Sequence, residues 1–194
     1  MTEYWDKFYK DFNVDAPSNF ASSICLPITG RLLELGCGNG RDTMYFASQR
    51  PCLNITALDT SVSALKQVQD KIGERRQIQA YEADATKRHI YNNCDVVYHR
   101  FFLHAVPPES QVKIIKNSVE ALRFGGLMCF ECRSDKNHGM HHTYGGHDRW
   151  LVNKDEVEQQ LASLRMIGCC QEIDGVARYQ NENPIVIRYI GTKI

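Results

Sequence analysis

The sequence has no excess of charge of either sign. Among its 194 residues, 23 are lysine or arginine and 23 are aspartate or glutamate, so the formal net charge is zero. Proteins that bind nucleic acid usually present a clearly basic face. The balanced total therefore disfavours a nucleic-acid partner, and we expect the chain to have none.

The sequence also lacks a long hydrophobic run. No stretch approaches the roughly 18 apolar residues of a membrane-spanning helix, and no apolar segment follows a basic N-terminus as in a secretory signal. We therefore expect a cytoplasmic protein with no membrane partner. The length suits one domain with a substantial core and is too short for two full-sized ones, so we expect a single domain over residues 1–194.

The eight cysteines lack a metal-binding pattern. Most of them lie in apolar, strand-like runs, where a free cysteine packs as a small hydrophobic residue. Cys129 and Cys132 have a zinc-like spacing, but residues three apart on a strand point to opposite faces. His138, His141 and His142 lack a fourth ligand at a suitable spacing. We therefore expect reduced thiols in the core and no metal.

The most informative feature that is present is the stretch 32–42. An apolar run ends there in three alternating glycines, Gly36, Gly38 and Gly40, and a helical pattern begins directly after them. The stretch predicts a buried strand, a tight turn and a helix. Glycine removes side chains where a ligand approaches the backbone, so the turn predicts a small-ligand site.

Strand-like and helical patterns alternate along the chain. The strand-like runs are 31–35, 54–58, 77–82, 94–98 and 127–132. The helical patterns begin at Asp42, span 61–72 and 110–122, the last closed by Gly125 and Gly126, and resume after an Asn153 cap. Five strands with crossover helices predict a doubly wound, mostly parallel α/β sheet, which binds ligands at the carboxyl ends of its strands. The final strand-like runs predict an antiparallel hairpin: 170–173, 176–179 and 184–190.

Aromatic residues dominate the N-terminus. Five of them recur at helical spacing and predict a helix with one aromatic face: Tyr4, Trp5, Phe8, Tyr9 and Phe12. Such a helix either packs on the body of the protein or covers a bound cofactor, because aromatic side chains offer a large area with few rotors. We expect residues 1–24 to form a helical lid and residues 25–194 to form the sheet and its crossover helices.

Acidic residues end two neighbouring predicted strands. Asp59 follows the second strand about 20 residues after the glycine turn, where a carboxylate can accept hydrogen bonds from both hydroxyls of a ribose. Alternatively it caps the next helix, although Thr60 and Ser61 could do so instead. Asp84 and Ala85 follow the third strand and could form hydrogen bonds with the edge of an adenine. These residues together predict an adenosine laid across the first three strand ends.

Two cofactors contain such an adenosine, a nicotinamide dinucleotide and S-adenosylmethionine. The dinucleotide fingerprint is G-x-G-x-x-G, whereas this chain has glycines at alternate positions with Glu34 just ahead of them. A carboxylate is unfavourable beside a pyrophosphate, but it suits a ligand with an ammonium and a sulfonium. We therefore favour S-adenosylmethionine.

These motifs resemble those of the class I S-adenosylmethionine-dependent methyltransferases, over nearly the whole chain. Within that group the chain is similar to small single-domain bacterial enzymes of the tellurite-resistance-like or capsule-associated kind. The resemblance implies a seven-stranded Rossmann-like sheet, with the glycine turn around the methionine part of the cofactor. The cofactor-binding residues that we expect are Glu34, Gly36, Cys37, Gly38, Gly40, Asp59, Thr60, Asp84, Ala85 and Arg100.

Two polar segments are left for the methyl acceptor: 98–104 and 131–149. One hypothesis is a small anionic acceptor, bearing a carboxylate or phosphate, that Arg100, Arg133 and Arg149 bind. Another is an amine or hydroxyl that His104 or His147 deprotonates. His104, His147 and Arg133 are therefore the candidate catalytic residues, although Arg100 and His104 could instead be structural, four residues apart on one helical turn.

Three other functions fit parts of the sequence. A nicotinamide-dependent reductase would share the adenosine site, and a non-catalytic S-adenosylmethionine-binding protein would keep the cofactor pocket alone. The ionisable residues on the acceptor side argue against the second. Methylation of protein or nucleic acid is the third, but no motif of the Asn-Pro-Pro-Tyr type follows the fourth strand. We therefore expect methyl transfer to a small polar metabolite.

Overall fold

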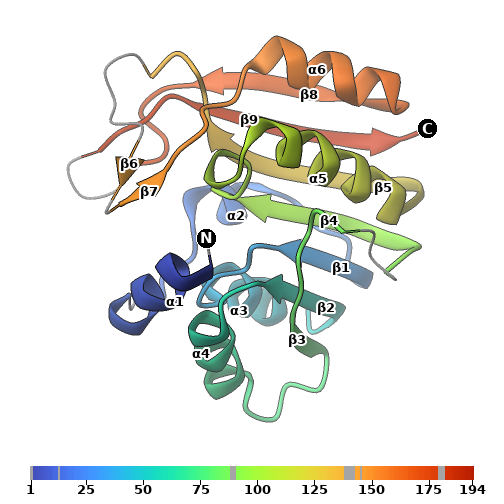
Figure 1. The fold of residues 1–194 in the computed structure, drawn as a ribbon. Helices are drawn as coiled ribbons and strands as arrows, with labels where there is room; N and C mark the ends of the chain where they lie inside the picture. The colour runs from blue at the N-terminus through green and yellow to red at the C-terminus, as the bar shows by residue number, and fades with distance from the viewer. Residues whose placement is uncertain (1, 13, 88–90, 138–142, 145, 179–181) are drawn as a thin grey trace.

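A seven-stranded sheet forms the centre of the protein. The computed structural model describes residues 2–12, 14–87, 91–137, 143–144, 146–178 and 182–194. The strand order is β3-β2-β1-β4-β5-β9-β8 (Figure 1). Strands β1 to β5 are parallel to one another, and β9 runs antiparallel between β5 and β8. The predicted doubly wound α/β sheet with a C-terminal antiparallel hairpin is therefore confirmed.

The elements follow the predicted alternation closely. The strands of the sheet are β1 (Thr29–Leu35), β2 (Cys52–Asp59), β3 (Ile78–Glu82), β4 (Cys94–Arg100), β5 (Leu122–Arg133), β8 (Met166–Ile173) and β9 (Val186–Lys193). A separate two-stranded ribbon consists of β6 (Thr143–Tyr144) and β7 (His147–Asp148). The helices are α1 (Thr2–Asp11), α2 (Asn19–Ser23), α3 (Arg41–Gln49), α4 (Val62–Ile72), α5 (Pro108–Ala121) and α6 (Lys154–Ser163), with a short 3₁₀ turn at Leu103–Ala105.

Helices cover both faces of the sheet. Leu32 of β1 belongs to a buried cluster that includes residues of α2 and α3. The next residue, Leu33, belongs to the larger cluster with residues of α5 and α6. This alternation follows because successive side chains of a strand point to opposite faces. The layers leave the carboxyl ends of the parallel strands open as a site.

The predicted N-terminal helix is present, and it lies at the edge where the parallel strands end (Figure 1). Asp6 of α1 accepts hydrogen bonds from the Ser61 hydroxyl at 2.7 Å and from the backbone N–H of Ser63 at 3.0 Å, at the start of α4. Gln67 of α4 donates to the carbonyl of Phe12 at 3.2 Å. These bonds fix α1 on α4, next to the glycine turn.

Two local predictions are wrong. Gly125 and Gly126 do not close a helix, because α5 ends at Ala121 and the chain enters β5 at once. A Cβ at Gly126 would lie 2.9 Å from the carbonyl oxygen of Cys94, so glycine there permits a close approach to β4. The chain at 176–178 forms no strand, and the Val176 carbonyl instead accepts a hydrogen bond from Asn19. Tyr179 lies outside the described residues.

The cysteines are only partly core residues. All eight are free thiols, and four of them are buried: Cys37, Cys94, Cys129 and Cys132. Cys25, Cys52 and Cys169 are exposed, contrary to the prediction.

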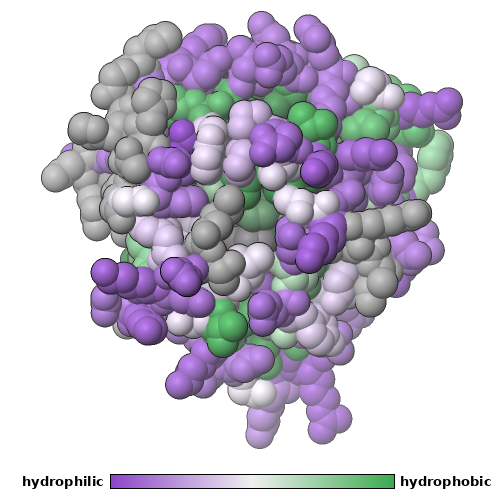
Figure 2. Space-filling view, in the orientation of Figure 1, coloured by the Kyte–Doolittle hydropathy of each residue, from purple (hydrophilic) through white to green (hydrophobic). Residues whose placement is uncertain are grey.

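Hydrophilic side chains cover most of the surface seen in Figure 2, with hydrophobic ones in small separate areas. In the described part of the chain, every helix is too short or too polar to cross a membrane.

Candidate functional site

A cavity of about 680 Å³ lies at the carboxyl ends of the parallel strands. This is the range of ordinary small-ligand pockets, roughly 300–1,000 Å³. The glycine turn after β1 lines this cavity. Strands β1 and β4 are adjacent in the sheet, although β2 and β3 come between them along the chain. The cavity therefore occupies the switch in strand order at which sheets of this kind bind ligands.

The glycine turn is a compact bend that leaves its backbone open. Gly36, Gly38 and Gly40 have φ values of +64°, +55° and +75°, which residues with a Cβ rarely adopt. A Cβ on Gly38 would lie 2.3 Å from the hydroxyl of Tyr9, the α1 side chain that enters the cavity here. Any side chain at Gly38 would therefore disrupt the contact between α1 and the turn.

Glu34 lies beneath the turn and is almost completely buried. Its carboxyl accepts a hydrogen bond from the Thr43 hydroxyl at 2.6 Å. Burial, with a smaller contribution from the nearby Asp42, raises the pKa of Glu34 well above its ordinary value. A carboxyl in this setting becomes more stable in its ionised form when a cation binds beside it, so Glu34 can hold an ammonium group.

Asp59 joins the glycine turn to the next helix. One carboxylate oxygen accepts from the Gly38 N–H at 2.8 Å and the other from the Ser61 N–H at 2.9 Å. Ser61 itself caps α4, as its hydroxyl accepts from Ala64. Each oxygen of an ionised carboxylate has a second lone pair. Asp59 can therefore accept two ligand hydroxyls while it holds the turn.

Asp84 and Ala85 line the cavity beyond the end of β3. One carboxylate oxygen of Asp84 accepts from both the backbone N–H and the hydroxyl of Thr86, at 2.9 and 2.7 Å. These bonds fix the turn after β3 and the orientation of the Asp84 carboxyl. Thr60 also lines the cavity, so the residues expected to hold an adenosine lie around one space.

The opposite end of the cavity is formed by the ends of β4 and β5. Glu131 is fully buried and accepts from the guanidinium of Arg100 at 2.8 Å and from that of Arg188 at 2.7 Å. Arg100 therefore pairs with a strand-end acid, although we expected it among the cofactor-binding residues. Arg188, from β9, was not predicted, because nothing near it in the sequence indicates a site.

Phe101 presents an aromatic ring at this end. Its φ is +52°, which is strained for a bulky residue and persists only where the surroundings fix it. Its backbone N–H donates to the Glu131 carbonyl at 2.8 Å. The guanidinium of Arg100 lies 4.1 Å from the ring centre and that of Arg133 lies 5.5 Å from it. The strained backbone therefore holds a flat ring beside two cations.

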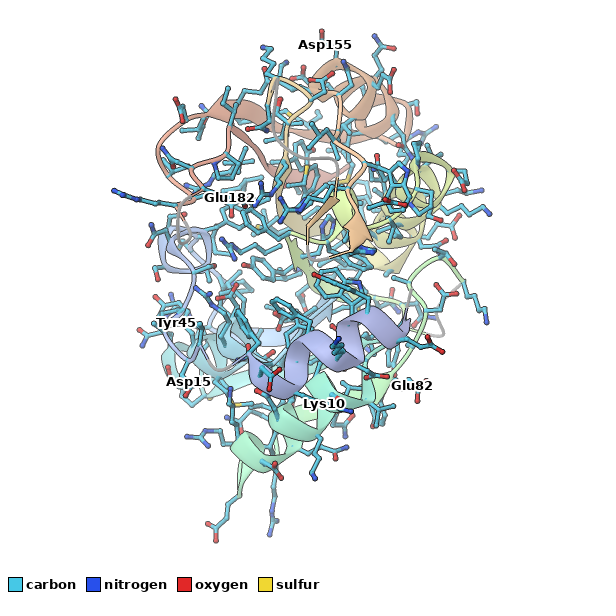
Figure 3. The ribbon with its side chains drawn as sticks, turned by 60° about the vertical axis from the view of Figure 1, so that its left-hand side comes forward. Lys10, Asp15, Tyr45, Glu82, Asp155 and Glu182 are labelled. Carbon is cyan, nitrogen blue, oxygen red and sulfur yellow. The ribbon has the colours of Figure 1, made fainter. Side chains whose placement is uncertain are left out.

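Two further arginines share one carboxylate near Phe101. Arg133 and Arg149 both form ion pairs with Glu182, which lies just before β9. Sequence reasoning missed Glu182 because it is 33 or more residues from both arginines. In Figure 3, Glu182 lies above α1, on the side of the molecule that β8 and β9 form.

Burial favours the neutral form of both candidate histidine bases. Nδ1 of His104 accepts the backbone N–H of Arg133 at 3.2 Å, and burial together with the nearby arginines holds the pKa of His104 well below its ordinary value. Nε2 of His147 lies 3.0 Å from the Ala105 carbonyl, and its ring stacks on Tyr4 at 4.9 Å. Burial also lowers the pKa of His147. The lone pair of His104 at Nδ1 is thus already engaged, so His104 is poorly arranged as a base.

His99 should make the stability of the protein sensitive to acid. Burial lowers the pKa of its imidazole from 6.5 to about 3, and neither ring nitrogen has a hydrogen-bond partner among the described residues. Between these two pKa values, the His99 imidazole is protonated in the unfolded chain and neutral in the folded chain. The free energy of unfolding therefore falls by about 1.4 kcal/mol for each pH unit below the unfolded pKa.

The His99→Phe variant should lose this dependence, because phenylalanine suits the stacked position beside Phe130. Urea unfolding at several pH values between about pH 6 and pH 5 measures the difference in slope. His99→Leu serves as a second variant if phenylalanine packs poorly. Equal slopes for the wild type and both variants would show that His99 is not the titrating group.

Charge is segregated inside the cavity. Its four acids belong to the cofactor end: Glu34, Asp42, Asp59 and Asp84. Four of its five arginines belong to the other end or to the C-terminal loops: Arg100, Arg133, Arg149 and Arg178. The remaining cation, Arg41, begins α3. One cavity therefore offers an acidic half and a basic half.

Among the residues that the structure describes, no histidines, cysteines and acids group as metal ligands. His138, His141 and His142 lie outside these residues.

Comparison with known proteins finds a matching family and a related protein. The family model described as a methyltransferase domain matches residues 33–128. A tRNA N(3)-methylcytidine methyltransferase of Drosophila melanogaster is 27% identical over 152 residues, which are 66% of this chain and 46% of that protein. The match thus spans less than half the length of that relative.

Two solved structures share the fold. A glycopeptide N-methyltransferase in complex with S-adenosylmethionine has a TM-score of 0.71 and 15% identity, over 92% of this chain and 95% of that one. A putative methyltransferase of Haloferax volcanii, solved with the Trm112 methyltransferase activator, has a TM-score of 0.75 and 10% identity, over 96% and 92% of the two chains.

The expected partners need correction. We expected a small-molecule acceptor and no nucleic acid, and the tRNA methyltransferase relative contradicts that expectation. The exclusion rested on a net charge of zero, which is a sum over the whole chain. That sum conceals the segregation of acids and arginines in the cavity, and only a local excess of positive charge is needed to attract phosphate.

The matched region begins inside β1 and ends inside β5, so it contains the glycine turn, Glu34, Asp59 and Asp84. The narrower resemblance to tellurite-resistance-like and capsule-associated bacterial enzymes stays a prediction. The alternative of a nicotinamide cofactor is not supported, since the matching family is of methyltransferase domains and a structural neighbour is solved with S-adenosylmethionine. From its strand order, its glycine turn and these likenesses, the chain belongs to the class I S-adenosylmethionine-dependent methyltransferases.

Proposed function

We propose that this chain transfers a methyl group to a ring nitrogen of a base in RNA, with tRNA as the first RNA to test. The Phe101 ring carries the proposal, because the guanidinium groups of Arg100 and Arg133 lie 4.1 and 5.5 Å from its centre. A flat ring beside cations can stack a base and attract the neighbouring phosphate. The matching tRNA methyltransferase supports RNA as the source of that base.

The acidic half of the cavity fits S-adenosylmethionine. We place the ammonium group beside Glu34, the ribose on Asp59 and Thr60, and the adenine beside Asp84 and Ala85. The remaining turn residues, Gly36, Cys37, Gly38 and Gly40, would surround the methionine part. The fit is supported by the open backbone of the turn and by the lone pairs that Asp59 retains. It is also supported by the acidic lining, which suits a cofactor that carries a sulfonium.

The protein's own contribution is positioning and the exclusion of water. When bound, the cofactor supplies a methyl group that its sulfonium charge has already activated. Positioning of two reactants can contribute roughly 7–11 kcal/mol to lowering a barrier. The aromatic face of α1 closes one side of the cavity and is held there by Asp6 and by the stack of Tyr4 on His147. We therefore propose α1 as the lid of the site.

A ring nitrogen with a free lone pair needs no general base. Its lone pair would accept the methyl group, and the cofactor would leave as S-adenosylhomocysteine, so no proton would have to be removed from the ring nitrogen. This chemistry agrees with the lowered pKa values of His104 and His147, which make both imidazoles weak proton acceptors. We propose that both histidines position neighbouring groups and that neither removes a proton.

The compartment is also part of the proposal. All eight cysteines are free thiols, three of them on the surface. Exposed free thiols persist best in a reducing compartment. We therefore place the reaction in the cytoplasm.

The test is methylation of RNA by the purified chain. The chain is incubated with S-adenosylmethionine carrying a labelled methyl group and with unmodified tRNA transcripts, and the digested nucleosides are separated by mass spectrometry. We expect label in a base-methylated nucleoside, with 3-methylcytidine as the first product to look for. Phe101→Leu should reduce this labelling at least about fivefold, because base stacking contributes about 1–3 kcal/mol.

The matched control is Phe124→Leu, since Phe124 is 77% exposed and lies outside the cavity residues. S-adenosylmethionine binding should stay the same in both variants. Release of S-adenosylhomocysteine with small acids or phosphorylated metabolites, and no label in any RNA, would overturn the proposed function.

A further inference from the structure

Glu182 bridges two arginines that are almost buried. The side chain of Arg133 is 3% exposed and that of Arg149 is 11% exposed, whereas that of Glu182 is 29% exposed. One guanidinium nitrogen of Arg149 lies 3.2 Å from a Glu182 oxygen, and Arg133 pairs with the other oxygen. The carboxylate is therefore the most accessible member of this cluster.

Counted over the described residues, this cluster has two positive charges and one negative charge. Two guanidinium groups share one carboxylate here, just as Arg100 and Arg188 share Glu131 at the neighbouring strand ends. Burial raises the pKa of the Glu182 carboxyl, but the hydrogen bond and charge of Arg133 and the charge of Arg149 outweigh burial and hold that pKa below its ordinary value. A partly buried site with excess positive charge favours an added anion.

The geometry suits one kind of anion. Guanidinium groups present paired N–H donors that match the oxygens of a carboxylate or a phosphate. The Arg133 guanidinium also lies 5.5 Å from the centre of the Phe101 ring. A ligand that stacks on this ring would therefore have the arginine pair beside it, as a nucleotide has a phosphate beside its base.

We propose that Arg133 and Arg149 form a subsite for a phosphate of the acceptor nucleotide, and that Glu182 occupies this subsite until the phosphate displaces it. The subsite rests on the proposed function, because it names the part of the RNA that the arginines hold. The carboxylate keeps the arginines paired when no acceptor is bound. Displacement then exchanges one anion for another, without leaving buried guanidinium groups unpaired at any stage.

The test compares two probes, cytidine 5′-monophosphate and cytidine, on the full chain saturated with S-adenosylhomocysteine. Glu182→Gln removes the competing charge and should tighten binding of cytidine 5′-monophosphate about tenfold, with little change for cytidine. Arg149→Met removes one cation and should abolish the preference for the phosphorylated probe. Glu158→Gln is the matched control, since Glu158 is an exposed residue of α6 paired with Lys154.

The outcomes separate this subsite from the proposed function. Methylated RNA, with no tightening in Glu182→Gln, would overturn the subsite and leave the function standing. Tightened nucleotide binding without any methylated RNA would support the subsite and overturn the function. Inorganic phosphate that binds as tightly as cytidine 5′-monophosphate, and that RNA does not displace, would overturn the assignment to a nucleotide.

Discussion

Replacing Asp59 with alanine is expected to weaken S-adenosylmethionine binding by at least about 100-fold. The change removes the carboxylate proposed to accept two ribose hydroxyls, and hydrogen bonds to a charged group contribute about 1.5–3 kcal/mol each. It also removes the acceptor for the Gly38 N–H at 2.8 Å and for the Ser61 N–H at 2.9 Å. The glycine turn would thus lose its fixed position together with its ligand contact.

Isothermal titration calorimetry with S-adenosylmethionine measures this loss, and Asp59→Asn separates its two causes. Asparagine keeps one oxygen acceptor for the turn but loses the charge, so an intermediate affinity is expected. Asp15→Ala is the control, because Asp15 is 69% exposed and pairs with Lys71 on the surface. Wild-type affinity in Asp59→Ala would show that the ribose is held elsewhere.

Replacing Glu131 with alanine should destabilise the fold by about 3–5 kcal/mol. Glu131 is fully buried between Arg100 and Arg188, whose side chains are only 19% and 15% exposed. Removing one member of a buried ion pair leaves uncompensated charge in a poorly solvated place. An ordinary domain is stable by roughly 5–15 kcal/mol, so the expected loss is a large part of the stability of the fold.

Urea unfolding of the full chain measures this change, and Glu120→Ala is the matched control. Glu120 forms an exposed pair with Lys116 on α5, at 3.9 Å, and its loss should cost less than about 1 kcal/mol. Glu131→Gln tests charge separately from volume and should also be strongly destabilised. A change in Glu131→Ala no larger than in Glu120→Ala would show that solvent or other groups compensate the two arginines.

That the glycine turn, Asp59 and Asp84 line one cavity could be predicted from the sequence because each of these parts is local. The glycine turn is one continuous stretch, and Asp59 and Asp84 each end a strand that hydrophobic patterning locates. In a parallel sheet those ends meet at one edge whatever the details of packing. The glycine pair Gly125–Gly126 was misread for the opposite reason: a Cβ on Gly126 would lie 2.9 Å from the Cys94 carbonyl of a neighbouring strand, and no local pattern encodes that approach.

The acceptor half was decided by tertiary structure. Arg133 and Glu182 are 49 residues apart, and Glu131 and Arg188 are 57 apart; only the antiparallel insertion of β9 beside β5 brings them together. Phe101 owes its position to a strained backbone bonded to β5, which composition does not reveal. A net charge of zero likewise concealed a cavity with one acidic and one basic end.

The sequence by itself therefore determined the fold class and the methyl donor, because hydrophobic periodicity and a contiguous turn are local properties of the chain. Tertiary structure alone decided which charges face each other at the acceptor end. Ion pairs between distant strands depend on register and strand order, and those are set by packing of the whole sheet.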